Sequence, residues 1–274
     1  MFSEGSVDKD LEFIYRRLFL EKKQQHSVSA VISAVPQVGT SWCALNIAHA
    51  LSLHNKKVLL VDGNGSFSNI STYVPSSNFL SLENYIRGDK TLNQLIFAYR
   101  NSNFNILTAQ PCSVYLDNQP LGRIHIFSQD LLIVAKDYFH TIIDIGTSIN
   151  EQNFGLCQIA DNILILCSEK SSDLIKTIET IRFIRKMNAS IPIYLIINRV
   201  ASFEDGYKIY KEFCKAFGQL SVDLPDLLGT IRFDTRIRET IRNKEMLLTC
   251  YPSSEAAVDI NNIALKLDLE NMDE

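Results

Sequence analysis

Residues 31–46 read Val31-Ile-Ser-Ala-Val-Pro-Gln-Val-Gly-Thr-Ser-Trp-Cys-Ala-Leu-Asn46 and have the layout of a phosphate-binding loop without its lysines. An apolar strand, residues 28–32, runs into a short turn, and an amphipathic helix, residues 42–53, leaves it. This layout aims the N–H groups at the start of a helix towards an anion. A working loop carries a lysine just before its Ser/Thr, whereas Thr40 stands there, next to Ser41. The sequence therefore predicts the fold of a nucleotide switch with altered chemistry.

The composition is that of one large globular domain. The chain has 274 residues, and its hydrophobic fraction of 46% can build a sizeable core. The net charge is −4, with 27 basic and 31 acidic residues and no long basic run, so there is no strong nucleic-acid signal. The 6 cysteines are scattered without a Cys-x-x-Cys pair, the apolar runs are too short to cross a bilayer, and no signal peptide is evident. A cytoplasmic protein with reduced thiols is expected.

Short apolar runs with helical patterns between them predict the fold class. Most runs are apolar throughout instead of alternating, which is typical of strands covered on both faces of a parallel sheet. Apolar residues spaced three and four apart, as at 44/47/48/51, 174/178/181/184 and 260/264/267, predict helices. This alternation indicates a three-layer, doubly wound, mainly parallel α/β domain. The expected strands are 28–34, 57–61, 104–107, 141–144, 162–166, 193–198 and 227–231.

No repeat or low-complexity linker divides the chain, so residues 27–267 are expected to form one domain. Residues 1–26 precede it, and a helix over Asp8 to Lys23 is predicted there, with its apolar residues on one side. Such a helix either packs against the domain or docks a partner. Residues 268–274 form an acidic tail.

Acidic residues end two of the predicted strands. In doubly wound sheets, ligands sit outside the carboxyl ends of the strands. Asp62 and Asp144 lie at such ends, and Ser41 follows the loop after the first strand. These oxygen ligands would suit Mg²⁺, directly or through waters. A single aspartate at a strand end also serves as a helix cap or turn former, which is the alternative for each of them.

At these motifs the sequence resembles the MinD/ParA family of deviant P-loop ATPases over nearly the whole chain. The family loop, Lys-Gly-Gly-x-Gly-Lys-[Thr/Ser] before an Asn-Leu-Ala helix, is similar to Val35-Pro-Gln-Val-Gly39-Thr40-Ser41 before Asn46-Ile-Ala48. The family's Val-Leu-Leu-Val-Asp-x-Asp is similar to Val58-Leu-Leu-Val-Asp62-Gly-Asn64. Its switch motif is similar to Tyr138-Phe-His-Thr-Ile-Ile-Asp144, and its base-recognition pair resembles Asn198-Arg199. The resemblance implies a P-loop NTPase fold.

Two narrower resemblances divide the chain. The C-terminal third looks most like the flagellar-number regulator FlhG, through Glu204-Asp-Gly-Tyr-Lys-Ile-Tyr210 and Leu228-Gly-Thr-Ile-Arg-Phe-Asp234-Thr-Arg-Ile-Arg-Glu-Thr-Ile-Arg242. The N-terminal half is also similar to bacterial tyrosine-kinase domains, which carry a proline in the loop and a preceding helix like Glu12-Phe-Ile-Tyr15-Arg16. The tyrosine-rich tail of those kinases is missing, because no tyrosine follows Tyr251.

The departures from the family pattern concern the charge of the loop. Val35 and Thr40 replace the two family lysines, Pro36 removes a backbone N–H, and Asn64 replaces the second acid of Asp-x-Asp. Both Walker A cations are therefore missing. Because phosphoryl transfer depends on positioning and charge neutralisation, their loss disfavours an ATPase. If the protein is active, Asp62 is the expected catalytic residue.

The resemblance implies either weak ATP or ADP binding with Mg²⁺ or an empty site. Arg123, Lys170 or Arg199 could supply a cation from elsewhere. The metal ligands would be Ser41, Asp62 and Asp144. The expected nucleotide-binding residues are Gly39, Thr40, Ser41, Trp42, Asn198 and Arg199.

The resulting hypothesis is an FlhG-like pseudo-ATPase that regulates a surface apparatus such as the flagellum through a protein partner. The resemblance implies an FlhF-like GTPase as partner, engaged by the helix at Asp8 to Leu20, and a possible homodimer. A C-terminal membrane-targeting helix is not expected, because four of the last seven residues are acidic. The alternatives are an active ATPase that dimerises around ATP, a kinase-like regulator of polysaccharide export, and a ParA-like DNA segregation factor.

Overall fold

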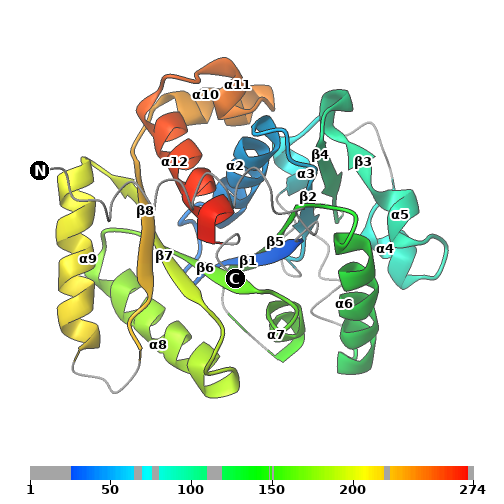
Figure 1. The fold of residues 1–274 in the computed structure, drawn as a ribbon, viewed down its shortest axis with the longest axis horizontal. Helices are drawn as coiled ribbons and strands as arrows, with labels where there is room; N and C mark the ends of the chain where they lie inside the picture. Colours follow the sequence, from blue (N-terminus) through cyan, green and yellow to red (C-terminus); the bar gives the residue numbers. More distant parts are fainter. Residues whose placement is uncertain are drawn as a thin grey trace, which may run out of the picture.

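A single open sheet organises the domain, seen in a computed structural model that describes residues 26–64, 70–75, 80–109, 119–147, 149, 151–218 and 223–270. The described residues form an eight-stranded sheet of order β3-β4-β2-β5-β1-β6-β7-β8 (Figure 1). β3 pairs antiparallel with β4, and every other pairing in the sheet is parallel. The strands are β1 Ser27–Ser33, β2 Val58–Asp62, β3 Phe97–Ala98, β4 Phe104–Leu107, β5 His140–Thr147, β6 Asn162–Cys167, β7 Ile193–Val200 and β8 Asp226–Arg232.

Helices cover both faces of this sheet. They are α2 Thr40–Leu53, α3 Ile70–Tyr73, α4 Leu82–Ile86, α5 Leu92–Leu95, α6 Leu121–Ala135, α7 Glu151–Cys157, α8 Ser171–Met187, α9 Phe203–Phe217, α10 Arg236–Asn243, α11 Leu247–Cys250 and α12 Glu255–Glu270, with a 3₁₀ turn at Tyr99–Asn101. Buried residues of α6, α7, α8 and α9 form one apolar layer against the sheet, and those of α2, α11 and α12 form the other. Figure 1 shows α2 and α12 on one side and α6 to α9 on the other.

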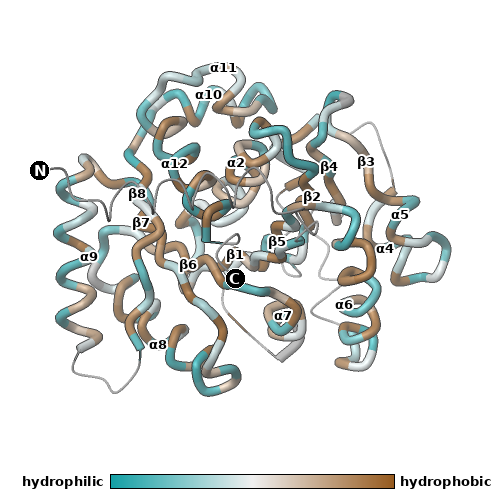
Figure 2. Tube along the Cα trace, viewed as in Figure 1, coloured by the Kyte–Doolittle hydropathy of each residue, from teal (hydrophilic) through white to brown (hydrophobic). Residues whose placement is uncertain are grey.

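The two apolar layers explain why the strands carry few polar residues. Within β1, Ala30 and Ile32 face the layer of α6 to α9, whereas Val31 faces the layer of α2. All seven residues of β1 are buried, so the strand has no face towards solvent, and its polar residues are three small serines, Ser27, Ser29 and Ser33. In Figure 2 the central strands are mostly brown, and the surrounding helices alternate between brown and teal. The predicted three-layer, mainly parallel α/β fold is confirmed.

The elements differ from the predicted ones mainly at their ends. Each of the seven predicted strands is present, with ends shifted by up to three residues, and β3 was not predicted. Helix α12 extends through Glu270, so the boundary predicted at residue 268 lies inside a helix. In this last part of α12, Asp268 forms an ion pair with Lys56 and a hydrogen bond with His140. The helix expected at residues 8–23 lies outside the described residues. Within the part of the chain that the structure describes, no helix is long and apolar enough to cross a bilayer.

Candidate functional site

The loop between β1 and α2 keeps the backbone shape of an anion cradle. Gln37 and Gly39 both have positive φ, 64° and 99°. Gly39 is the residue before α2, and a Cβ atom there would lie 2.9 Å from Asn198 Nδ2, so only glycine fits both the conformation and the space. Helix α2 begins at Thr40, directly after this turn. Its first-turn N–H groups therefore lie where a phosphate-binding loop presents them.

Val35 and Thr40, which stand at the two positions of the family lysines, take part in hydrogen bonds within the loop. Thr40 Oγ1 donates to Ser33 Oγ at 2.7 Å, and Ser33 Oγ donates to the Val35 carbonyl oxygen at 2.9 Å. Val35 and Thr40 are 8% and 6% exposed, and Val35 packs in the apolar layer of α2. Ser33 Oγ also lies 3.4 Å from Thr147 Oγ1, which joins the loop to the end of β5. The loop is thus closed on itself by neutral groups, and Ser33 and Thr147 belong to it although no sequence pattern indicated them.

Two carboxylates lie side by side at the carboxyl edge of the sheet. Asp62 at the end of β2 is in register with Asp144 of β5, as the strand ends predicted. Asp144 Oδ1 accepts a hydrogen bond from the Gly146 amide at 3.0 Å. Burial raises the pKa of Asp144 from 3.8 to about 6, and the Ser41 hydroxyl and the Gly146 amide act in the opposite direction. Asp144 is therefore a carboxylate whose charge lacks full compensation within the described residues.

This pair fits a magnesium ion. Asp144 Oδ2 is buried and receives no hydrogen bond from the described residues, which leaves a lone pair for a cation or its water. Ser41, in the first turn of α2, is near enough to influence the pKa of Asp144. Ser41, Asp62 and Asp144 would hold Mg²⁺ by oxygen, the donor that this ion prefers. A bound Mg²⁺ would neutralise phosphate charge at the mouth of the loop.

Two neighbouring residues serve packing rather than ligand contact. Asn64 lies against the backbone of Gly146: a Cβ atom added at Gly146, whose φ is 80°, would be 2.5 Å from the Asn64 amide. Trp42 is 5% exposed and packs in the apolar layer of α2. Its indole therefore faces the core, and only its backbone N–H, as part of the first turn of α2, could meet a nucleotide.

Asn198 and Arg199 reach the same site from β7. Asn198 Nδ2 donates to the carbonyl oxygen of Val38 in the loop at 2.7 Å. Arg199 is exposed and has a φ of 65°. Burial raises the pKa of the Cys43 thiol in α2, and the charge of Arg199 acts in the opposite direction, so this guanidinium is close to the first turn of α2.

Among the three substitute cations that the sequence suggested, the structure brings Arg199 to the loop. Arg123 lies on α6 and donates to the carbonyl oxygen of Ile86 at 2.9 Å. Lys170 is the residue before α8, and its backbone N–H donates to Ser168 Oγ at 3.3 Å. Among the predicted site residues, Gly39, Thr40, Ser41, Asp62, Asp144, Asn198 and Arg199 therefore meet at one edge of the sheet, and the side chain of Trp42 points away.

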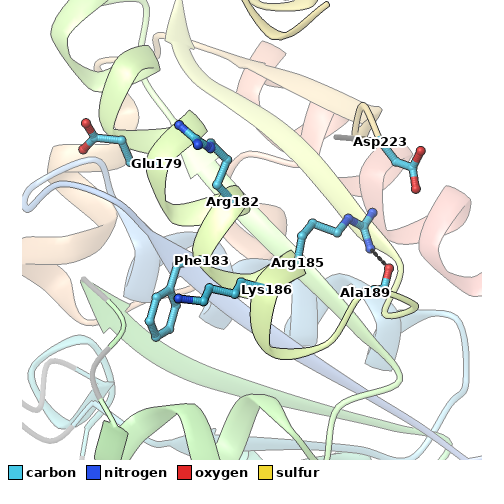
Figure 3. A pocket seen from close by; sticks show the side chains of 7 residues that line it. All are labelled: Glu179, Arg182, Phe183, Arg185, Lys186, Ala189 and Asp223. Carbon is cyan, nitrogen blue, oxygen red and sulfur yellow. Dashed lines mark hydrogen bonds between the residues drawn. The ribbon is translucent and has the colours of Figure 1, made fainter. Parts of the chain in front are cut away.

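A surface hollow lies away from this loop. It measures about 600 Å³ and is lined mainly by the last turns of α8, as Figure 3 shows. Arg185 donates there to the carbonyl oxygen of Ala189 at 3.0 Å. Because α8 starts at the carboxyl edge of the sheet, this end lies at the opposite edge from the loop. Arg185 and Lys186 lie in the last turn of α8, where basic residues compensate the helix dipole, so these charges have a structural explanation.

Solved structures of the MinD and ParA families share this fold. MinD from Pyrococcus horikoshii OT3, complexed with Mg-ADP, superposes with a TM-score of 0.75 at 20% identity, covering 90% of this chain and 98% of that one. A ParA family ATPase from Chlorobium tepidum TLS gives 0.74 at 21% identity, covering 88% and 99%. MinD from Aquifex aeolicus, in a MinC:MinD complex, gives 0.73 at 16% identity, covering 90% and 96%. No protein-family model matches the sequence, and neither does any curated protein.

These likenesses confirm that the chain has the fold of MinD and ParA P-loop ATPases, as the motifs indicated. At identities of 16–21% they establish the fold, and the chemistry has to come from the site itself. The site keeps the backbone cradle and the acidic pair of that fold. It lacks a lysine at positions 35 and 40.

Proposed function

We propose that the protein is a MinD/ParA-type regulator that holds a nucleotide weakly, does not turn it over, and acts by binding a protein partner. The observation that carries this proposal is the self-contained loop. Thr40, Ser33 and the Val35 carbonyl satisfy one another at 2.7 and 2.9 Å, in the place where a cation would meet phosphate. The shape of the cradle therefore depends on neutral hydrogen bonds and not on a bound anion.

The absence of the two loop lysines should affect the rate of phosphoryl transfer more than nucleotide binding. A positioned cation supplies several kcal/mol of transition-state stabilisation in phosphoryl transfer, on the order of a thousandfold in rate. Arg199 is exposed on a strand end, so its guanidinium is less fixed than a loop lysine. Backbone N–H groups and Mg²⁺ remain as the binding elements, which supports weak binding without fast hydrolysis.

An active ATPase is the second candidate, and one feature favours it. The raised pKa of Asp144 and its unsatisfied oxygen are costly in a protein that binds no metal. In this case ATP would induce a homodimer, and Asp62→Ala would abolish turnover. The structure of Pyrococcus horikoshii MinD was solved with Mg-ADP, which makes the same ligand a reasonable first probe for this chain.

The biological role is proposed from the resemblance to FlhG: spatial or numerical control of a surface apparatus such as the flagellum. An FlhF-like GTPase is the proposed partner, bound through residues 8–20, which precede the described residues. A protein partner has a parallel in the MinC:MinD complex of Aquifex aeolicus. A tyrosine-kinase-like role in polysaccharide export would instead require phosphotyrosine on the purified protein.

The first test is calorimetric titration with ATP and ADP in the presence of Mg²⁺, together with measurement of phosphate release. We expect weak, Mg²⁺-dependent binding and no release above background. Thr40→Lys should raise ATP affinity by roughly tenfold, because it returns a cation to the cradle. Thr40→Met, of similar length and no charge, is the matched control and should not raise it. Phosphate release by the wild type at rates ordinary for ATPases would refute the proposal.

The partner interaction gives a second test. Ser41→Ala and Asp144→Ala remove the proposed magnesium ligands, and both should leave partner binding nearly intact if no nucleotide switch is needed. Loss of partner binding in both variants, with folding unchanged by circular dichroism, would show that the site still works as a switch.

A further inference from the structure

Asn198 is a buried polar side chain that contacts the loop from β7. It is 4% exposed, at the end of β7. Its Nδ2 donates to the Val38 carbonyl oxygen at 2.7 Å and lies 3.7 Å from Cys43 Sγ, while its Oδ1 accepts the backbone N–H of Arg199 at 2.9 Å. Both donors of Asn198 are therefore engaged with the protein, and its Oδ1 keeps one further lone pair.

The hydrogen bond to Val38 fixes the orientation of one peptide plane in the loop. In a trans peptide, the carbonyl of one residue and the N–H of the next point in opposite directions. With the Val38 carbonyl held by Asn198, the N–H of Gly39 must point away from Asn198. The Gly39 carbonyl in turn accepts the N–H of Cys43 at 2.9 Å, which ties the other side of Gly39 to α2. The peptide between Val38 and Gly39 is thus set from both sides.

From this geometry we infer that Asn198 is a positioning residue for the phosphate-binding loop, holding the Val38 carbonyl so that the Gly39 N–H faces the anion. This inference rests on the proposed anion-binding loop, but it requires neither turnover nor a particular partner.

The end of β7 is built to place this side chain. Arg199 has a φ of 65°, which is uncommon for a residue with a side chain and costs about 1 kcal/mol. The pairing of β7 with β8 shifts register between Asn198 and Val200, so Arg199 is an extra residue at this point. Bulges of this kind re-aim a side chain next to functional sites. Here the bulge ends the strand with Asn198 on the side of α2 and Val200 in the opposite apolar layer.

Binding of inorganic pyrophosphate distinguishes a loop-positioning role of Asn198 from a base-recognition role, because pyrophosphate has no base. Calorimetry with pyrophosphate, ATP and GTP is carried out on the wild type and on Asn198→Ala. A loop-positioning role predicts that all three affinities fall by the same factor, roughly tenfold for the loss of one buried hydrogen bond. Asn162→Ala, a buried asparagine at the opposite edge of the neighbouring strand β6, is the matched control and should leave them unchanged. Unchanged pyrophosphate affinity with a lost preference between ATP and GTP would overturn the inference.

A second readout needs no ligand. The protein has 1 tryptophan, Trp42, 5% exposed in the first turn of α2. Removing the Val38 hydrogen bond should loosen this turn and raise quenching of Trp42 fluorescence by acrylamide, in Asn198→Ala and in the near-isosteric Asn198→Asp, which turns an acceptor towards the Val38 carbonyl. Equal quenching in wild type and variants would refute the inference. A wild type that binds neither pyrophosphate nor nucleotide would refute only the proposed function, and quenching would still decide the role of Asn198.

Discussion

Replacing Asp144 by asparagine should make the nucleotide-free protein more stable. Asp144 is 0% exposed, and burial raises its pKa from 3.8 to about 6. Since this folded-state value lies above that of the unfolded chain, ionisation of Asp144 at neutral pH opposes folding. At about 1.4 kcal/mol for each tenfold change in acidity, the opposition is about 3 kcal/mol. Asparagine keeps an oxygen for the Gly146 amide and removes the charge, so we expect Asp144→Asn to raise the free energy of unfolding by about 2–3 kcal/mol at pH 8.

The gain should depend on pH in a defined way. Well below pH 3.8 the carboxyl is protonated in both the folded and the unfolded chain, so the charge no longer opposes folding. The difference between variant and wild type should therefore shrink to about 1 kcal/mol near pH 4.5 and reach its full size above pH 6. Urea denaturation in EDTA, followed by circular dichroism at pH 4.5, 6 and 8, measures it. Other titrating groups are common to both proteins and cancel in the difference.

Two outcomes would refute this reasoning. A loss of stability in Asp144→Asn at pH 8 would show that the hydrogen bond from Gly146 outweighs the buried charge. A gain that is the same at pH 4.5 and pH 8 would show that its cause is not ionisation. If the wild type alone gains stability from Mg-ADP, the same carboxylate is identified as a ligand by mass action.

Three further changes follow from the structure. Asp268→Asn should lower stability by about 1 kcal/mol at pH 7, after allowance for solvent screening. Although burial acts to raise the pKa of Asp268, the His140 hydrogen bond and the Lys56 charge lower it to about 2. The stabilisation is therefore present above pH 4 and lost on going from pH 4 to pH 2, which thermal melts across that range would check. Gly146→Ala should cost about 2–4 kcal/mol in urea denaturation, because its φ is 80° and the new Cβ would meet Asn64 at 2.5 Å. Burial and the nearby Arg100 lower the pKa of His49 from 6.5 to about 4, so the wild type should lose stability as pH falls from 6.5 to 4, and His49→Leu should flatten that slope in melts at pH 5 and 7.

The parts of the fold that the sequence predicted are those where burial leaves one choice of residue. All of β1 is buried, which favours small and apolar residues there, and Gly39 has a positive φ and would place an added Cβ atom only 2.9 Å from Asn198 Nδ2, which favours glycine. The closeness of Asp62 and Asp144 is likewise predictable, since Asp62 ends β2 and Asp144 lies opposite it in the parallel strand β5, which continues to Thr147.

The remainder depends on contacts between residues far apart in the chain. Strand β3 has two residues, Phe97 and Ala98, too few for a periodic pattern. Past the predicted boundary, Asp268 of α12 contacts His140, 128 positions away. The hydrogen bond from Asn198 to Val38 spans 160 positions. A sequence indicates that an asparagine ends a strand, but not which group its amide will meet.

The loop itself shows why loss of charge need not entail loss of shape. In a loop that carries lysine, the ammonium is satisfied by phosphate, and loop order is coupled to the ligand. Here Val35 lies in the apolar layer of α2, and Thr40 and Ser33 satisfy each other at 2.7 Å. A buried lysine without phosphate would need a partner, whereas valine and threonine need none beyond those the fold supplies. With valine at 35 and threonine at 40, the hydrogen bonds of the loop are therefore complete without a bound anion.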